Sequence, residues 1–111
     1  MSDNINTHMI DELKELMEDD FPVLIETYIE DGDERIESLQ SAIDDNNSEQ
    51  VREVAHAFKG SSANLGATKL SEVCYSLENI GREAKLVEAQ AVLDSIKTEY
   101  QVVRNYFNSL L

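Results

Sequence analysis

The sequence predicts an all-α protein: an antiparallel up-and-down four-helix bundle with a short extra N-terminal helix. Along four long segments, apolar residues recur at intervals of three and four, the spacing that places side chains on one face of a helix. Short polar connections separate these segments, and no stretch alternates apolar and polar residues as a half-buried strand does. Four glycines and one proline in 111 residues also provide too few turns for a β sandwich or barrel.

The chain is expected to begin with a short amphipathic helix packed across one end of the bundle. Its apolar side would consist of Ile10, Leu13, Leu16 and Met17. The first long helix should start near Phe21, with Asp20 as its N-cap and Pro22 in the first turn, where a missing N–H costs little. Its inward stripe would be Phe21, Ile25, Tyr28, Gly32, Ile36, Leu39 and Ile43. Gly32 either weakens this helix or lets a neighbouring backbone approach, and the pattern leaves both open.

The remaining three helices follow from the same periodicity. The polar run 44–48 ends the first long helix and caps the next, whose inward residues are Val51, Val54, Ala55, Phe58, Ser62 and Leu65. Gly66 stands where a C-terminal glycine is expected, and Thr68 can cap the following helix. That helix would bury Leu70, Val73, Cys74, Leu77 and Ile80, with Gly81 near its end. The last helix would bury Val92, Ile96, Tyr100, Val103, Phe107 and Leu110.

Length and charge restrict the class of protein. A chain of 111 residues suits one domain, so we expect a single domain over residues 1–111. The net charge of −14 lies wholly in residues 1–50, which hold 16 acidic residues and only two basic ones, whereas residues 51–111 hold seven of each. Such an acidic field repels phosphate backbones and anionic lipids, so neither nucleic acid nor membrane is an expected partner.

Several sequence features that the chain lacks exclude further classes of protein. One cysteine excludes an internal disulfide and a cysteine-built zinc site, and Cys74 is expected to be a small core residue. The N-terminus lacks the pattern of a secretory signal, and no apolar run reaches transmembrane length, so we expect a cytoplasmic protein. The polar outer faces of the helices favour a monomer.

His56 is the most informative residue of the chain, whereas His8 precedes the first apolar stripe and is expected to face solvent. His56 should project outward from the middle of its helix. Three or four positions away on the same strip are Arg52, Lys59, Gly60 and Ala63. Glycine in a helix interior costs about 1 kcal/mol relative to alanine, so the missing side chain at Gly60 is expected to serve the close approach of a partner.

This arrangement suits a transient anion. A neutral imidazole is a good nucleophile near pH 7, and a phosphoryl group on its nitrogen stays labile. A phosphoryl group adds a charge close to −2, which the ammonium of Lys59 could partly offset. We therefore expect Lys59, Gly60, Arg52 and Ala63 to stabilise the phosphoryl group or to dock the partner.

These residues also carry a family resemblance. The run His56-Ala-Phe-Lys-Gly-Ser-Ser-Ala-Asn-Leu-Gly-Ala67 resembles the signature of histidine-containing phosphotransfer (HPt) domains of phosphorelays, and the segments 74–78 and 81–82 are similar to the family's next helix. The resemblance covers essentially the whole chain, since HPt domains are four-helix bundles of about this length. It implies that His56 is phosphorylated, that Lys59 contacts the phosphoryl group and that Gly60 leaves room for the partner. It further implies that Glu78 orients the histidine by a hydrogen bond.

The resemblance also implies a mechanism shared with partners. The sequence has no phosphate-binding loop of the G-x-x-x-x-G-K-[ST] type, so it is not expected to use ATP, and we expect neither a cofactor nor a bound metal. The chain would be a phosphocarrier rather than an enzyme. It would accept the phosphoryl group from the receiver domain of a hybrid sensor histidine kinase and pass it to the receiver domain of a response regulator. Those receivers would supply the reacting aspartate, the magnesium ion and most catalytic groups.

Two other functions remain to be weighed. Glu53 and His56 form an E-x-x-H motif, as in di-iron bundles, but the second motif is missing because Ile5 stands three residues before His8. The alternative function is a non-catalytic acidic helical interaction module, which the charge of the first half favours and the His56–Lys59–Gly60 pattern does not. A phosphorylation assay distinguishes the phosphocarrier from the interaction module. The sequence identifies neither the cognate partners nor the direction of flux.

Overall fold

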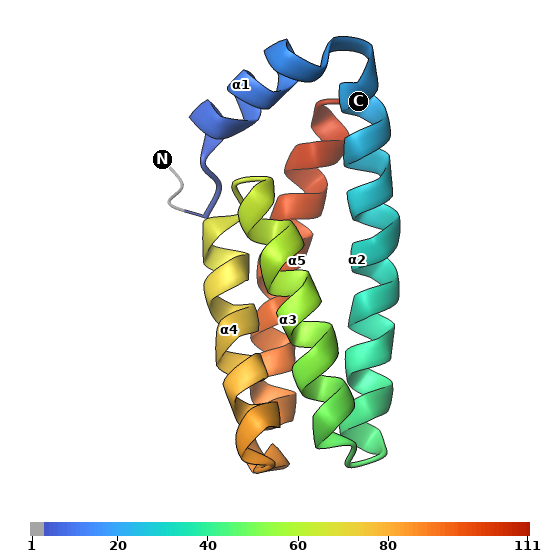
Figure 1. The fold of residues 1–111 in the computed structure, drawn as a ribbon, viewed down its shortest axis with the longest axis vertical. Coiled ribbons are helices and arrows are strands. Elements are labelled where there is room, and N and C mark those ends of the chain that lie inside the picture. The colour runs from blue at the N-terminus through green and yellow to red at the C-terminus, as the bar shows by residue number, and fades with distance from the viewer. Residues whose placement is uncertain (1–3) are drawn as a thin grey trace.

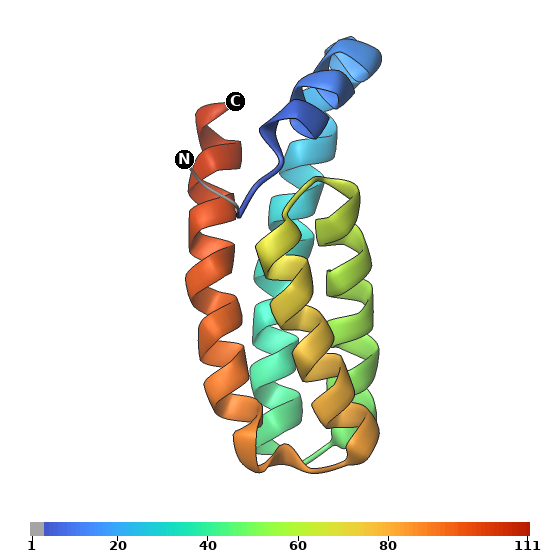
Figure 2. The ribbon, with the colours of Figure 1, turned by 90° about the vertical axis from the view of Figure 1, so that its left-hand side faces the viewer.

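The computed structural model describes residues 4–111 and confirms the predicted bundle of antiparallel helices (Figure 1). Its elements, in chain order, are α1 (Thr7–Met17), a 3-10 turn η1 (Glu18–Asp20), α2 (Phe21–Asp44), α3 (Ser48–Asn64), α4 (Thr68–Glu83), a second 3-10 turn η2 (Leu86–Glu88) and α5 (Ala89–Ser109). Helices α2 to α5 run alternately up and down along the 42 Å axis, and α1 lies across one end of them. Both views show α3 and α4 side by side along their length (Figure 2).

Side-chain caps and one glycine set several helix ends. The side chain of Asn6 accepts a hydrogen bond from the N–H of Met9, and that of Asn47 accepts one from the N–H of Gln50. Each therefore satisfies an N–H group that has no partner inside its helix. Gly66 follows the end of α3 with a φ of +76°, a conformation that costs glycine little. The predicted boundaries around residues 44–48 and at Gly66 are confirmed.

One of the two predicted caps is in place and the other is wrong. Asp20 holds the N-cap position of α2 as predicted, but its side chain makes no capping hydrogen bond, because the backbone already coils through η1 and enters α2 in the helical conformation. Thr68 is the first residue of α4 and not its cap; Ala67 holds the cap position without a side-chain hydrogen bond. The Thr68 hydroxyl instead lies 3.4 Å from the carbonyl oxygen of Asn4, in the segment that leads into α1.

The predicted stripes form one core. Ile25, Leu39, Phe58, Leu77 and Phe107 are among the residues that are fully enclosed. Cys74 is buried as predicted, and burial raises the pKa of its thiol to about 12. Other members of the predicted stripes are only partly buried at the edges of the bundle: Ile36, Ile43, Val54, Val73, Ile80, Val92 and Leu110.

The apolar face of α1 is narrower than predicted. Ile10 is buried and Leu13 and Met17 are partly buried, but Leu16 is 81% exposed, which contradicts its predicted inward position. Ile5, ahead of the helix, is buried instead. The N–H of Asn6 donates to the carbonyl of Gly66 at 2.7 Å, so the chain entering α1 is tied to the α3–α4 turn. That tie fixes which side of α1 meets the core.

Gly32 leaves space for the side chain of Tyr100. The expected approach of a neighbouring backbone is not observed there. A Cβ atom added there would lie 2.5 Å from the Tyr100 ring and hydroxyl. The Tyr100 hydroxyl lies 2.8 Å from the carbonyl oxygen of Ile29 and 2.7 Å from Oδ1 of Asp33. Tyr100 therefore joins α5 to α2 beside Gly32, where α2 has no side chain in its way.

None of the helices within residues 4–111 combines the length and the apolar character needed to cross a bilayer.

Candidate functional site

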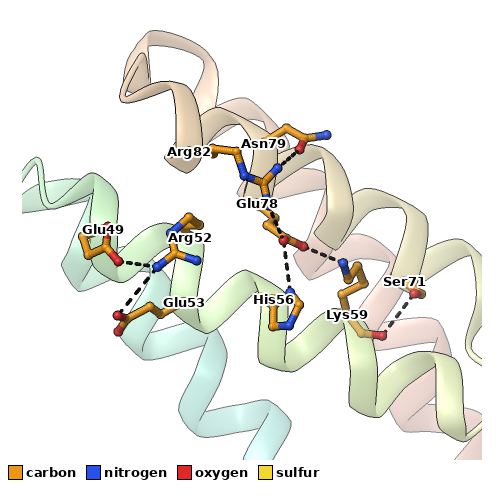
Figure 3. A network of polar contacts seen from close by, with 9 residues as sticks. All are labelled: Glu49, Arg52, Glu53, His56, Lys59, Ser71, Glu78, Asn79 and Arg82. Carbon is orange, nitrogen blue, oxygen red and sulfur yellow. Dashed lines mark hydrogen bonds and ion pairs between the residues drawn. The ribbon is translucent and has the colours of Figure 1, made fainter.

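The imidazole of His56 projects outward from the middle of α3. Its side chain is 63% exposed, while Ala55 and Phe58 on the same helix are fully buried. The stripe that faces the core therefore turns His56 toward solvent, as the helical spacing predicts. The ring lies on the side of α3 that adjoins α4 (Figure 3).

A buried carboxylate holds one nitrogen of this ring. Glu78 of α4 is only 2% exposed, and its Oε2 lies 3.0 Å from Nδ1 of His56. An ionised carboxylate can only accept hydrogen bonds, so Nδ1 must carry the hydrogen and donate it. In the neutral ring, the lone pair that remains for chemistry is then on Nε2. The structure thus brings together His56 and the residue predicted to orient it.

Glu78 also binds two cations. Lys59 Nζ lies 2.8 Å from Oε1, and a terminal nitrogen of Arg82 lies 2.8 Å from Oε2, the oxygen that faces His56 (Figure 3). Burial opposes the ionisation of Glu78, but the hydrogen bonds and charges of Lys59 and His56 outweigh it and lower the pKa of the carboxyl. The carboxylate is therefore charged near neutral pH and surrounded by donors from both helices.

A glycine lets the two helices approach closely enough for this contact. A Cβ atom added to Gly81 would lie 2.7 Å from the backbone nitrogen of Arg52 and 2.9 Å from the carbonyl oxygen of Ser48. The backbone of α3 thus packs directly on α4 at Gly81, three residues after Glu78. This close packing explains how a short glutamate side chain, almost out of solvent, spans from α4 to His56.

The other three predicted site residues lie on the same outward strip. Arg52 turns its guanidinium to Glu49 and Glu53 of its own helix, and its hydrogen bond lowers the pKa of Glu49. Gly60 and Ala63 are exposed. A Cβ atom on Gly60 would meet no atom within 4 Å, so the surface next to His56 is open there.

Two residues of the site were not predicted as functional. Arg82 was noted only as part of the family pattern, although its position four residues after Glu78 is a typical ion-pair spacing. Tyr75 lies beneath Lys59, with Nζ 5.0 Å from the ring centroid, and is 51% exposed. Lys59 is therefore held between the carboxylate of Glu78 and the face of an aromatic ring.

The E-x-x-H pair does not belong to a larger ligand set. Within residues 4–111, no group of three or more His, Cys, Asp and Glu side chains is placed to hold a metal ion. Glu53 faces Arg52, and the exposed His8 pairs with Glu12 on α1 at 2.7 Å.

Comparisons with known proteins agree with this geometry. The model of the Hpt domain family matches residues 23–106. The structure of histidine-containing phosphotransfer protein B from Pseudomonas aeruginosa superposes with a TM-score of 0.94 and 34% identity, covering 98% of this chain and 95% of that chain. Multistep phosphorelay regulator 1 of Schizosaccharomyces pombe is 30% identical over 113 residues, 93% of this chain and 38% of that protein.

A more distant structure shares the fold. Saccharomyces cerevisiae Ypd1, crystallised with the receiver domain of its downstream response regulator Ssk1, superposes with a TM-score of 0.86 and 20% identity, covering 96% of this chain and 93% of that chain. The chain spans less than half the length of the first curated relatives it matches, 38% and 40%.

Proposed function

The chain belongs to the Hpt domain family, and from this premise we propose that it is a phosphorelay intermediate whose phosphorylated residue is His56. It accepts a phosphoryl group from an aspartate of one receiver domain and passes it to an aspartate of another. We further propose that residues 1–111 act as one domain in this exchange. The observation that carries the proposal is the exposed imidazole whose Nδ1 is held by a buried carboxylate.

The geometry suits nucleophilic attack at phosphorus. Nε2 of His56 uses its lone pair to form a bond to the phosphorus of an aspartyl phosphate, and the phosphorus–oxygen bond breaks with its electron pair leaving on the aspartate carboxylate. The ring becomes positively charged, because Nδ1 keeps its hydrogen. Glu78, 3.0 Å from Nδ1, stabilises that charge as it develops. Transfer to the next aspartate is the same reaction reversed.

Lys59 would respond to the new charge. Its ammonium binds Glu78, and its side chain is 27% exposed at the edge of the site. A phosphoryl group on Nε2 brings a charge close to −2. We propose that Lys59 then shares its ammonium between Glu78 and the phosphoryl oxygens, while Arg52, which is paired with Glu49 and Glu53, helps to dock the partner.

The partner would dock over the open strip. Gly60 and Ala63 present almost no side chain next to His56, so another protein can bring an aspartyl phosphate up to the ring. The crystallised pair of Ypd1 and a receiver domain supports partners of this class. We propose two such partners, the receiver domain of a hybrid sensor histidine kinase and that of a response regulator.

The chain would be a phosphocarrier, with the metal chemistry supplied by its partner. We propose that the receiver domain brings the magnesium ion, since within residues 4–111 no group of carboxylates and histidines offers a cation site beside His56. A cytoplasmic location would suit the free thiol of Cys74, because cytosolic thiols stay reduced.

Labelling by phosphorylated receivers tests this function. The purified chain is incubated with each phosphorylated hybrid-kinase receiver of its organism, beside the variant His56→Gln. We expect one or a few receivers to label the wild-type chain rapidly and none to label the variant, while circular dichroism shows equal helix content. Undiminished labelling of the variant would exclude His56. Stable binding of receivers without labelling would favour the non-catalytic interaction module.

A further inference from the structure

The carboxylate of Glu78 has more cationic partners than orienting a histidine requires. Its side chain is 3% exposed and contacts three donors: Lys59 on Oε1, and both His56 and Arg82 on Oε2. Arg82 is 53% exposed and reaches in from one turn further along α4. It therefore binds the same oxygen atom that receives the hydrogen from His56 (Figure 3).

The contact between Arg82 and Glu78 bears on two opposed effects that the carboxylate has on His56. A carboxylate next to an imidazole holds the ring, but it also favours the protonated, cationic form. The cationic ring has no lone pair on Nε2 and cannot attack phosphorus. A site that uses Glu78 to orient His56 therefore needs a positive charge close to the carboxylate, so that the ring is held without being protonated.

We propose that Arg82 is a positioning residue that keeps His56 in its neutral, nucleophilic form by balancing the charge of Glu78. The inference rests on the proposed function, since a neutral ring matters only if His56 is the nucleophile. Lys59 binds the other carboxylate oxygen, Oε1, whereas Arg82 binds Oε2, the oxygen that faces the ring. Arg82 is anchored to Oε2 and to the side chain of Asn79, so it can remain with Glu78 throughout.

The other charged groups around His56 leave this role to Arg82. On α3, Arg52 is bound by Glu49 and Glu53, so this group brings no net positive charge to the site. On α2, the charged side chains Asp31, Glu34 and Arg35 line the α2–α3 groove beside Glu53. On α4, Glu78 is the carboxylate in contact with the ring, and Arg82 and Lys59 are the cations in contact with that carboxylate.

Carbethoxylation by diethyl pyrocarbonate tests the inference without any partner protein. The reagent reacts with the neutral form of imidazole and not with the protonated form. The chain contains its own reference, since His8 on α1 pairs with Glu12 and does not contact Arg82. The ratio of the rates at His56 and His8 is measured by peptide mass spectrometry between about pH 6 and pH 8.5, a range that spans the ordinary titration of histidine. The variants are Arg82→Ala, Arg82→Lys and Glu78→Gln, with Arg82→Ala also made in the Glu78→Gln background.

We expect Arg82→Ala to lower the ratio about threefold near pH 6 and to leave it unchanged at high pH, where the ring is neutral in either protein. Arg82→Lys should restore most of the rate, and Arg82→Ala should have little effect once Glu78 is glutamine. Arg104→Ala serves as the control, because it removes another arginine from an ion pair, with Asp33 between α5 and α2. It should leave the ratio as in the wild-type chain.

A ratio that Arg82→Ala leaves unchanged near pH 6, or lowers equally at every pH, would overturn the inference. An equal fall at every pH would indicate a structural role. Since no receiver takes part, this result is independent of the labelling experiment. A chain that shows the expected reactivity but accepts no phosphoryl group would refute the proposed function and not the role of Arg82.

Discussion

At the scale of single residues, Glu78 is the group on which the site depends. It is almost inaccessible to solvent, yet its pKa is lowered because Lys59 and His56 hydrogen-bond to its charged form. A buried carboxylate with these partners is stabilising only while it is ionised. The same contacts that orient the imidazole therefore also join α3 to α4.

The stability contributed by Glu78 should depend on pH. In the unfolded chain its carboxyl titrates near the ordinary value of 4.5, whereas in the folded protein its pKa lies lower. The unfolded state therefore binds more protons in acid, so the contribution is complete above about pH 4.5 and is lost as the pH falls through the folded value. We expect the free energy of unfolding of the wild-type chain to exceed that of Glu78→Gln at neutral pH, and the difference to shrink toward pH 3.

Urea denaturation at a series of pH values measures this difference. The relief of repulsion among the other acidic residues affects both proteins alike, so the comparison isolates Glu78. The exposed Glu72 of α4 provides a control, since Glu72→Gln should give no such pH-dependent difference. A gap between wild type and Glu78→Gln that stays constant from neutral pH to pH 3 would contradict the stabilising role of the ionised carboxylate.

At the scale of the elements, the pair α3–α4 forms the site, and its two glycines have opposite surroundings. Gly81 lies against the backbone of α3 and permits the close packing that lets Glu78 reach His56. Gly60 faces open space on the outer side of α3. One glycine thus serves packing inside the protein, and the other leaves a surface free for a partner.

Gly60→Gln should therefore affect docking far more than folding. Glutamine favours a helix over glycine by roughly 0.5 kcal/mol, so the variant should unfold at the same or a slightly higher urea concentration. The added side chain would stand where the receiver approaches, and we expect its affinity for the receiver to fall about tenfold or more. Isothermal titration calorimetry measures the affinity. The matched control is Ala91→Gln, which adds the same side chain to the exposed face of α5. If Gly60→Gln and this control bind the receiver with equal affinity, the proposed docking surface is refuted.

The elements also show what sequence reasoning could and could not reach. Periodicity predicted the helices α2 to α5 and the outward position of His56, because both follow from which residues are apolar. It failed for Leu16, because α1 is oriented by the tie between Asn6 and Gly66 and by the turn η1. The cap predicted at Thr68 lies one residue earlier, at Ala67. These are contacts between distant segments or local backbone choices that leave no periodic signal.

The polar contacts of the site were also predicted only in part. The hydrogen bond between His56 and Glu78 was predicted through the family resemblance. The shared contact of Arg82 was not, although its spacing from Glu78 is visible in the sequence. The Arg82–Glu78 pair could be exposed or could enclose a buried carboxylate. Which of these occurs depends on how closely α3 packs on Gly81, and the spacing of residues along one helix does not reveal that distance.

At the scale of the whole molecule, the charge distribution suits a phosphoryl carrier. The excess of −14 lies in residues 1–50, a range that includes α1, α2 and the start of α3, while residues 51–111 are neutral overall. The cations Arg52, Lys59 and Arg82 lie together around His56 in the neutral half. A negatively charged aspartyl phosphate is therefore repelled by the α1–α2 side and meets no net repulsion at the neutral α3–α4 side.

The most direct test of the account is the position of the phosphoryl group on the phosphorylated protein. The chain is labelled by a phosphorylated receiver and examined by phosphorus NMR and by long-range proton–nitrogen correlation of its two histidines. The account predicts a phosphorus–nitrogen bond at Nε2 of His56, with Nδ1 still carrying its hydrogen. A phosphoryl group on Nδ1 of His56, on His8 or on any other residue would contradict it.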